Sequence, residues 1–344
     1  MTLQRLLKDS RFIDLRAPLE FARGSVPNAT NLPLLDDSQR AAVGLMYKNS
    51  GQAAAIALGE QLVSGPCRET RMQGWAQALR DDPDLQFFCW RGGLRSQIVV
   101  DWLSDLGLNA NRVEGGYKAL RQTCLDTLQS AALSPLPWRI LGGRTGSGKT
   151  SLLTLLTNSI DLEGLAHHRG SAFGATSTPQ PTLIDFENQL ALNWLNHTAH
   201  SLVLEDESRT IGRLAIPETW HVRMGRAPLV LLEVSLDERI QNIVDEYVHQ
   251  PLARGVDAGH LLESLKDSLS RIQKRLGGVR HGQLVQMLEQ AFVSQDHSGW
   301  VGGLLTGYYD PMYDYQLEKK DGRVCFRGGF KDITEYLTDE AAWD

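Results

Sequence analysis

The sequence predicts an α/β protein of two domains, each built on parallel strands. In the first part of the chain, short apolar runs at residues 12–15 and 86–89 alternate with helical patterns such as residues 97–106. This alternation is typical of parallel strands joined by crossover helices. The second part has strand-length apolar runs, again separated by helix-length segments, at residues 139–141, 202–205 and 229–234. Beyond residue 235 the pattern is mainly helical.

A proline-containing connector separates the two predicted domains. Residues 130–138 read SAALSPLPW, and Pro135 and Pro137 stop a helix from continuing through this run. We therefore expect a first domain at residues 1–129, a linker at residues 130–138, and a second domain with a helical C-terminal extension at residues 139–344. The chain has 344 residues, of which 42% are hydrophobic, so it is long enough to fill two cores.

Charge and cysteine content narrow the expected environment. A formal net charge of −6 argues against an extended basic surface and leaves room for a local basic face only. The four cysteines lie far apart without a C-x-x-C pair, so neither a disulfide framework nor a structural metal is predicted. We expect a soluble protein of the reducing cytoplasm, because no stretch approaches the roughly 20 apolar residues that span a bilayer.

A cysteine loop is the first candidate site. Cys89 follows an apolar strand and precedes a predicted helix that opens around Arg95 and Ser96. Free N–H groups at a helix N-terminus stabilise an anion, and two glycines at positions 92 and 93 let the loop curl so that these donors converge. Arg91 and Arg95 add positive charge. We therefore expect a nucleophilic Cys89 thiolate, in a cradle that would also hold a persulfide or perselenide.

Two classes of enzyme use a loop of this kind. Cys89 and Arg95 have the C-x5-R spacing of cysteine-dependent phosphatases, although Phe88 stands where many of these enzymes carry histidine. The segments at residues 12–16, 20–33 and 113–117 resemble the opening and closing signatures of rhodanese-like domains. That resemblance implies a sulfur-type carrier with Cys89 at the matching position. Asp14 and Arg16, in the opening signature, are expected to form a structural ion pair.

A phosphate-binding loop opens the second domain. Residues 143–150 read GRTGSGKT and satisfy G-x-x-x-x-G-K-[ST] between a short strand and an apolar helix. Backbone N–H groups of such a loop bind phosphate oxygens, the lysine supplies a point charge, and the last residue is a candidate ligand for Mg²⁺. The predicted phosphate-binding residues are Gly143, Arg144, Thr145, Gly146, Ser147, Gly148, Lys149 and Thr150. The motif predicts phosphate binding and leaves open whether the ligand is a nucleotide or another diphosphate.

A strand that ends in carboxylates is the candidate acidic partner of this loop. The apolar residues 201–204 run into Glu205, Asp206 and Glu207. These carboxylates are candidates for orienting Mg²⁺ or for acid–base chemistry, as in Walker B segments, or they form an ordinary solvated strand end. No resident cofactor and no certain metal follow from the sequence.

Basic residues offer candidate contacts with RNA or a ligand. The selected positions are Arg169, Arg209, Arg271, Lys274 and Arg275. On a helix the last three share one face, which suits an RNA backbone and equally suits a solvated surface.

The order of the two loops resembles the bacterial tRNA 2-selenouridine synthases. The resemblance is carried by residues 89–96 and 142–150, and by further segments at 47–51, 162–171, 205–209 and 271–278. It implies exchange of sulfur for selenium at C2 of a wobble 2-thiouridine in tRNA. Selenophosphate would donate selenium, and geranyl diphosphate would first alkylate the sulfur. Cys89 would then act in selenation, while the loop around Lys149 would hold a diphosphate or selenophosphate.

Two other classes of function fit the same two loops. One is a rhodanese-type sulfurtransferase fused to an ATP- or GTP-dependent kinase or switch, and the other is a sensor that binds phosphates without catalysis. Only a tRNA 2-selenouridine synthase would form a new wobble nucleoside, so this product separates it from both of these classes. We expect no membrane partner.

Overall fold

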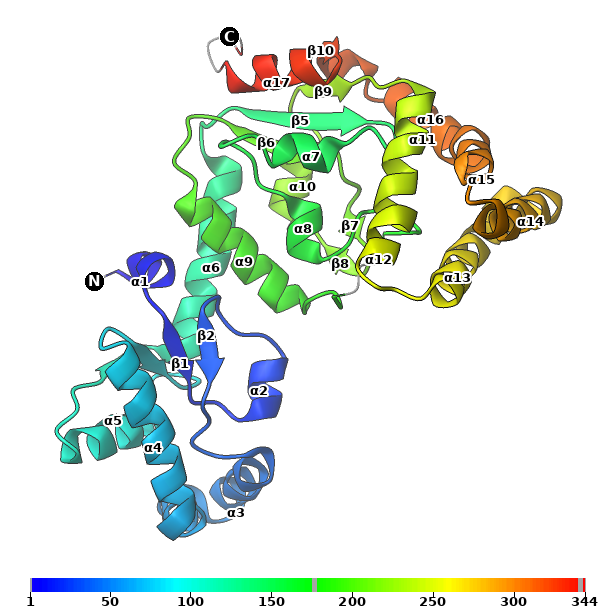
Figure 1. Ribbon diagram of the computed structural model, residues 1–344. Coiled ribbons are helices and arrows are strands. Elements are labelled where there is room, and N and C mark those ends of the chain that lie inside the picture. Colours follow the sequence, from blue (N-terminus) through cyan, green and yellow to red (C-terminus); the bar gives the residue numbers. More distant parts are fainter. Residues whose placement is uncertain (1, 175–177, 340–342, 344) are drawn as a thin grey trace. The chain divides into compact units, whose positions relative to one another are not determined.

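The computed structural model describes residues 2–174, 178–339 and 343, and it divides into two compact units (Figure 1). The first unit comprises Met1–Ala131 and Pro181–Asn196, and the second comprises Ala132–Gln180 and His197–Asp344. The first unit therefore ends inside the proposed linker. The first unit also contains Pro181–Asn196, which the expected division at one linker places in the second domain.

A four-stranded parallel sheet forms the centre of the first unit. Its strands are β1 (Phe12–Asp14), β2 (Ala29–Asn31), β3 (Gln86–Phe88) and β4 (Asn111–Arg112), in the order β2-β1-β3-β4. Every residue of β1 and β3 is buried, which explains why both strands are continuous apolar runs in the sequence. The helices of this unit are α1 (Leu3–Asp9), α2 (Pro18–Ala22), α3 (Asp37–Leu62), α4 (Gly65–Asp81), α5 (Leu94–Asp105), α6 (Gly116–Leu133) and α9 (Leu183–Asn196).

Helix α9 joins the first unit through polar contacts as well as packing. The backbone N–H of Ser25 donates to Asp185 at 2.8 Å, and the side-chain amide of Asn188 donates to the carbonyl of Ser25 at 2.6 Å. Arg121 of α6 binds both Glu187 and Asn188. Because these bonds satisfy buried backbone groups, α9 is an integral part of this unit rather than a loose excursion of the second.

A second parallel sheet, in the order β10-β9-β5-β6, forms the centre of the second unit. Its strands are β5 (Trp138–Gly143), β6 (Leu202–Glu205), β9 (Leu229–Leu232) and β10 (Val324–Gly328), and a small antiparallel pair is formed by β7 (Thr210–Ile211) and β8 (Leu214–Ala215). The predicted strands at 139–141, 202–205 and 229–234 are confirmed. Strand β10 comes from the part of the chain beyond residue 235, where the sequence pattern is mainly helical and predicts no strand.

The predicted helical C-terminal part is also confirmed. Beyond β9 the helical elements of this unit are α11 (Leu236–Val244), η1 (Asp245–His249), α12 (Gln250–Ala253), α13 (Ala258–Leu276), α14 (Gly278–Ser294), α15 (Ser298–Leu304), η2 (Leu305–Tyr309), α16 (Asp310–Glu318), η3 (Asp321–Arg323) and α17 (Phe330–Thr338). The earlier helices are α7 (Lys149–Leu153), α8 (Leu162–Ala166) and α10 (Glu218–Met224). In Figure 1, α11 and α16 lie at the end of the sheet toward which β5 points, where ligands bind in open α/β sheets. Among the described residues, no helix is long and apolar enough to cross a membrane.

Candidate functional site

The cysteine loop lies between β3 and α5 and is closed by the turn that precedes α6. The backbone N–H groups of Tyr117 and Lys118 donate to the carbonyls of Cys89 and Trp90, at 2.9 and 3.0 Å. A Cβ atom at Gly116 would lie 2.2 Å from the Gly92 nitrogen and 2.3 Å from the Cys89 carbonyl oxygen. Because no side chain fits there, the glycine lets the two segments approach closely enough to fix the shape of the loop.

The thiol of Cys89 is buried inside this loop. Its Sγ lies 3.4 Å from Oγ of Ser96 and 3.9 Å from the carbonyl oxygen of Gly93, and Ser96 in turn donates to Gly93 at 3.0 Å. The residue is 3% exposed. The position before the first turn of α5 matches the placement predicted from the sequence.

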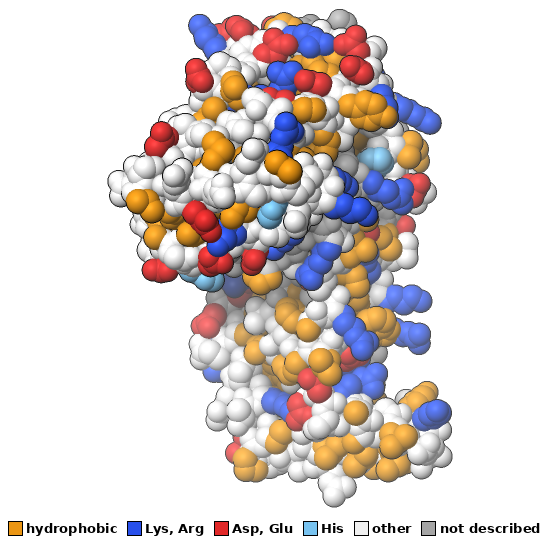
Figure 2. All heavy atoms as spheres, turned by 90° about the vertical axis from the view of Figure 1, so that its right-hand side faces the viewer, with side chains coloured by type: hydrophobic (Ala, Val, Ile, Leu, Met, Phe, Trp, Pro, Cys, Tyr) orange, Lys and Arg blue, Asp and Glu red, His pale blue; other side chains and the backbone are white. Residues whose placement is uncertain are grey.

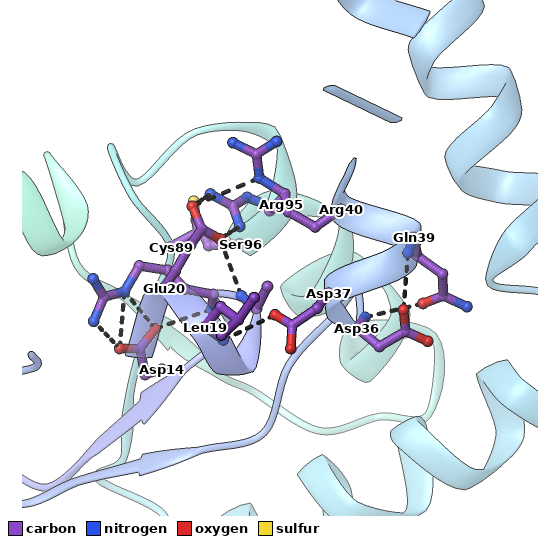
Figure 3. A network of polar contacts seen from close by, with 12 residues as sticks. Asp14, Leu19, Glu20, Asp36, Asp37, Gln39, Arg40, Cys89, Arg95 and Ser96 are labelled. Atoms are coloured by element: carbon purple, nitrogen blue, oxygen red, sulfur yellow. Dashed lines mark hydrogen bonds and ion pairs between the residues drawn. The ribbon is translucent and has the colours of Figure 1, made fainter. Parts of the chain in front are cut away.

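Glu20 is the ion-pair partner of the loop arginine (Figure 3). Nη1 of Arg95 lies 2.7 Å from Oε2 of Glu20, and Nε of Arg40 lies 3.6 Å from Oε1. Burial by itself raises the pKa of Glu20, but the bond and charge of Arg95, with the N–H of Ala17 and the charge of Arg40, outweigh burial and lower the pKa. Arg95 is therefore largely neutralised by a carboxylate, while Arg91 is exposed. Neither arginine is hydrogen-bonded to Cys89, whose partners are Gly93 and Ser96.

The expected ion pair of Asp14 and Arg16 is confirmed and is fully buried. Nη2 of Arg16 lies 2.5 Å from Asp14, which also accepts a 2.9 Å bond from Oγ of Ser25. The guanidinium carbon of Arg16 lies 3.7 Å from the ring centroid of Tyr117. Because Tyr117 also donates its N–H to the Cys89 carbonyl, the contact between Arg16 and Tyr117 helps to hold the cysteine loop in place.

The phosphate loop has the predicted strand and helix on either side. It follows β5, and α7 begins at Lys149. Gly146 and Gly148 have φ angles of +83° and +80°, a region that favours glycine. Nζ of Lys149 donates to the carbonyl of Gly143 at 2.8 Å, so the amine lies folded across the loop. Within the described part of the chain, the buried Oγ of Ser147 has no hydrogen-bond partner.

Helix α11 supports the loop from outside. Arg239 donates to the carbonyl of Thr145 at 3.0 Å, and Asn242 donates to the carbonyl of Gly146 at 2.9 Å. These two bonds fix the backbone of the loop against α11, and within the loop the N–H of Ser147 donates to the carbonyl of Arg144 at 3.1 Å. Arg144 pairs with Asp314 at 2.7 Å. It is the one residue of the motif that does not line the cavity beside the loop, which is described next.

A cavity of about 1150 Å³ opens beside the phosphate loop, entirely within the second unit. Its lining includes the loop from Gly143 to Ser151, apart from Arg144, together with Glu163, Asp206 and Glu207. The lining also includes the aromatic and apolar side chains of Tyr247, Tyr308, Tyr309, Met312 and Tyr313, of which Tyr313 lies beside the phosphate loop at Gly142. The cavity therefore combines a phosphate cradle with a surface that suits hydrocarbon or a base.

The three predicted carboxylates have three different environments. Glu205 is fully buried and accepts a 3.1 Å bond from the N–H of Leu162, and burial, followed by the neighbouring Asp161, raises the pKa of Glu205 well above its usual range. Asp206 accepts bonds of 2.7 Å at both oxygens from Nζ of Lys320. Only Asp206 and Glu207 line the cavity.

Glu207 and Glu163 form a hydrogen-bonded carboxyl pair beside Lys149. Burial raises the pKa of Glu207 to about 9, the charge and hydrogen bond of Glu163 act in the same direction, and Lys149 opposes them. Burial likewise raises the pKa of Glu163, against the lowering effect of Lys149 and of the bond with Glu207. Two carboxyl groups this close share a proton at neutral pH because both cannot be charged without strong repulsion.

The carboxylates as arranged do not fit a Mg²⁺ site. Asp206 is paired with Lys320 and Glu207 with Glu163, while Glu205, whose buried Oε1 has no hydrogen-bond partner among the described residues, does not line the cavity. No group of three or more His, Cys, Asp and Glu side chains in the described residues has the arrangement of a metal site. Thr150 lines the cavity without a carboxylate free to complete a ligand set.

Four of the five predicted basic residues surround the cavity. Arg169, Arg271, Lys274 and Arg275 line it, the last three from α13. Arg169 pairs with Glu246 at 2.6 Å, and Arg271 donates to the carbonyl of Ala172 at 3.5 Å. The fifth, Arg209, pairs with the exposed Glu218 at 2.9 Å outside this lining. Figure 2 shows blue and red side chains interspersed on the face of the second unit that it presents, as the negative net charge leads one to expect.

Several residues of the two sites carried no sequence signal of their role. Glu163 lies in a segment that the resemblance had marked, but its pairing with Glu207 depends on two elements more than 40 residues apart. Lys320 and the tyrosines of α16 and η2 come from the C-terminal extension, beyond residue 304. Their aromatic enrichment was visible in the sequence, yet only the fold brings them to the phosphate loop.

The geometry defines a protein in which an α/β unit with a cysteine loop is joined to a P-loop unit with a deep cavity. Residues 136–343 match the family model for the tRNA 2-selenouridine synthase AAA domain. Curated proteins named tRNA 2-selenouridine synthase match almost the whole chain. One from Marinobacter nauticus is 47% identical over 97% of this chain and 95% of its own length, and one from Sulfurovum sp. is 43% identical over 97% and 96%. The chain belongs to the tRNA 2-selenouridine synthase family.

Proposed function

We propose that this protein converts a wobble 2-thiouridine of tRNA into 2-selenouridine in two steps. The first is S-geranylation by geranyl diphosphate, and the second is selenation by selenophosphate. The observation that carries this proposal is the cavity of the second unit, whose lining combines the phosphate loop with aromatic side chains. A ligand with a diphosphate head and a hydrocarbon tail fits both parts of this lining, and the membership of the chain in the family supports the assignment.

In the first step, the sulfur of 2-thiouridine attacks C1 of the geranyl group. A C–S bond forms, the C–O bond to the diphosphate breaks, and the proton on N3 of the base passes to water. The N–H groups of the loop and Nζ of Lys149 stabilise the charge that develops on the departing diphosphate. Arg271, Lys274 and Arg275 lie around the same cavity and would bind phosphates of the RNA.

In the second step, selenium attacks C2 of the base and the geranyl thiolate leaves as the C–S bond breaks. The thiolate takes a proton from water, N3 of the base regains from water the proton that it lost in the first step, and water cleaves the selenium–phosphorus bond of the donor to release phosphate. We assign this step to the first unit, for which we propose a rhodanese-like fold. Support comes from its parallel sheet and from Cys89, which stands between β3 and the first turn of α5. That loop would favour an anionic sulfur or selenium.

The proposal is tested by mass spectrometry of tRNA nucleosides. Purified protein is incubated with 2-thiouridine-containing tRNA and geranyl diphosphate, and selenophosphate is then added. We expect an S-geranylated nucleoside first and 2-selenouridine after the addition. Turnover of ATP or GTP without any new nucleoside would instead support a nucleotide-dependent kinase or switch, which the same P-loop would serve.

A further inference from the structure

The long helix α3 of the first unit is folded into a hairpin over α5. Its backbone breaks at Gly51, where φ is +81° and ψ is −176°, so residues 37–50 and 52–62 form two arms. The arms touch where a Cβ at Gly59 would lie 3.9 Å from Cγ2 of Val43. The segment 47–51 had been marked by the resemblance without a role. In the structure it is the bend that makes this hairpin possible.

A second cavity, of about 290 Å³, lies between the hairpin and α5. Its lining is almost entirely apolar and includes Val43, Ala55, Ile56, Ile98 and Trp102. The volume is close to the lower end of the roughly 300–1,000 Å³ typical of small-molecule sites. It therefore has room for one short hydrocarbon group and is too small for a nucleotide.

This cavity adjoins the cysteine loop. Leu34, Leu35 and Val63 line it and belong to the same hydrophobic cluster as Cys89. Leu94 and Arg95, the first two residues of α5, also line it, and the next residue, Ser96, contacts the thiol at 3.4 Å. The cavity and the thiol thus contact consecutive residues in the first turn of α5.

The chemistry of the lining excludes an anion. Arg95 is the one cation among the lining residues, and its guanidinium is bound to Glu20 at 2.7 Å. Large apolar side chains are instead left open to solvent at the rim, since Tyr47 is 60% exposed and Leu94 is 45% exposed. Figure 2 also shows hydrophobic side chains exposed on the surface of the first unit, in the lower part of the view. Exposed apolar side chains around an apolar hollow are typical of a site for an apolar ligand.

We propose that this cavity binds the geranyl group of the S-geranylated nucleoside while selenium replaces sulfur. The inference rests on the proposed function and adds a binding site for the leaving group. Holding the hydrocarbon beside the cysteine loop positions C2 of the base for attack and withdraws the departing thiol into an apolar compartment. The diphosphate has already been released before this step, so the hydrocarbon no longer carries an anionic group that the phosphate loop would bind.

The test uses tRNA that has been S-geranylated beforehand, so that selenation is measured alone. Ile56→Trp and Ile98→Trp fill the cavity, and Leu45→Trp is the matched control, because Leu45 lies on the same hairpin, is 61% exposed and is not part of the lining. We expect both filling variants to reduce kcat/KM for selenation by at least about tenfold, since each buried methylene is worth roughly a factor of four in binding. Geranylation of 2-thiouridine tRNA by the same variants should stay within about twofold of wild type, as a check that they are folded.

A widening variant gives a readout that misfolding would not produce. Ile98→Ala enlarges the cavity, and we expect it to raise the rate of selenation of S-farnesylated tRNA relative to S-geranylated tRNA by about tenfold. If the filling variants carry out selenation with the kcat/KM of wild type, and Ile98→Ala leaves the preference for prenyl chain length unchanged, the cavity does not hold the prenyl group. If wild type fails to selenate the S-geranylated tRNA at all, the proposed function itself is wrong, which is a different outcome.

Discussion

Replacing Glu207 by Gln should make the protein less sensitive to alkaline pH. Burial, with Glu163 beside it, raises the pKa of Glu207 from 4.5 to about 9. The folded protein therefore keeps a proton that the unfolded chain releases, and stability falls as pH rises between these two values. One such proton is worth at most about 1.4 kcal/mol per pH unit, so from about pH 6 to about pH 8 wild type should lose up to about 3 kcal/mol through this group.

In Glu207→Gln that loss should disappear, because the amide cannot ionise and can still donate to Glu163. The assay is urea unfolding followed by circular dichroism at a series of pH values. Glu335→Gln is the control, because this residue is on α17 with a side chain that is 68% exposed. Titrating groups that are not coupled to Glu207 or Glu163 are common to both proteins and cancel in the difference. A pH slope in Glu207→Gln equal to that of wild type would mean that Glu207 is charged in the fold, and the shared-proton reading would be wrong.

Three further substitutions test the two loops. Lys149→Ala should weaken binding of inorganic diphosphate about 10- to 100-fold in calorimetry, since a charge-assisted hydrogen bond is worth about 1.5–3 kcal/mol, while the exposed control Lys331→Ala should bind as wild type does. Cys89→Ala should abolish selenation and spare geranylation in the nucleoside assay, and retained selenation would remove Cys89 from the mechanism. Gly116→Ala should destabilise the first unit by at least about 1–3 kcal/mol, because its Cβ would lie 2.2 Å from the Gly92 nitrogen, whereas Gly93→Ala, with open space around its Cβ and a φ of −93°, should be close to neutral in thermal unfolding.

Local patterns predicted the buried strands, including the edge strand β6, and failed at the exposed edge strands β4 and β10. Strands β1, β3, β5 and β9 are buried along their whole length, so they read as continuous apolar runs. Strand β4 has two exposed polar residues, and β10 alternates partly buried with exposed ones. Strand β10 pairs with β9 across more than 90 residues, and no local composition encodes that pairing.

The sites divide in the same way between local and distant information. Cys89 and the loop around Lys149 are short motifs whose chemistry follows from backbone conformation near one glycine-rich turn. The partners that change this chemistry come from distant segments, as Glu20 does for Arg95 and Lys320 for Asp206. For this reason the sequence predicted Asp206 as a candidate for Mg²⁺, whereas the fold commits its charge to a lysine more than 100 residues later.

The two cavities differ in charge as the two steps of the proposed reaction require. Before the first step the hydrocarbon is attached to a diphosphate, so its site needs N–H donors and a lysine as well as an apolar surface, and the cavity beside Lys149 has both. After that step the same hydrocarbon is attached to a nucleoside through sulfur and carries no charge. A site for it needs no anion donors, and the cavity beside the cysteine loop offers none, since its one cation is paired with Glu20. A single cavity lined by cationic side chains would bind the diphosphate more tightly than the neutral thioether. Two separate sites therefore let each step bind its own form of the ligand.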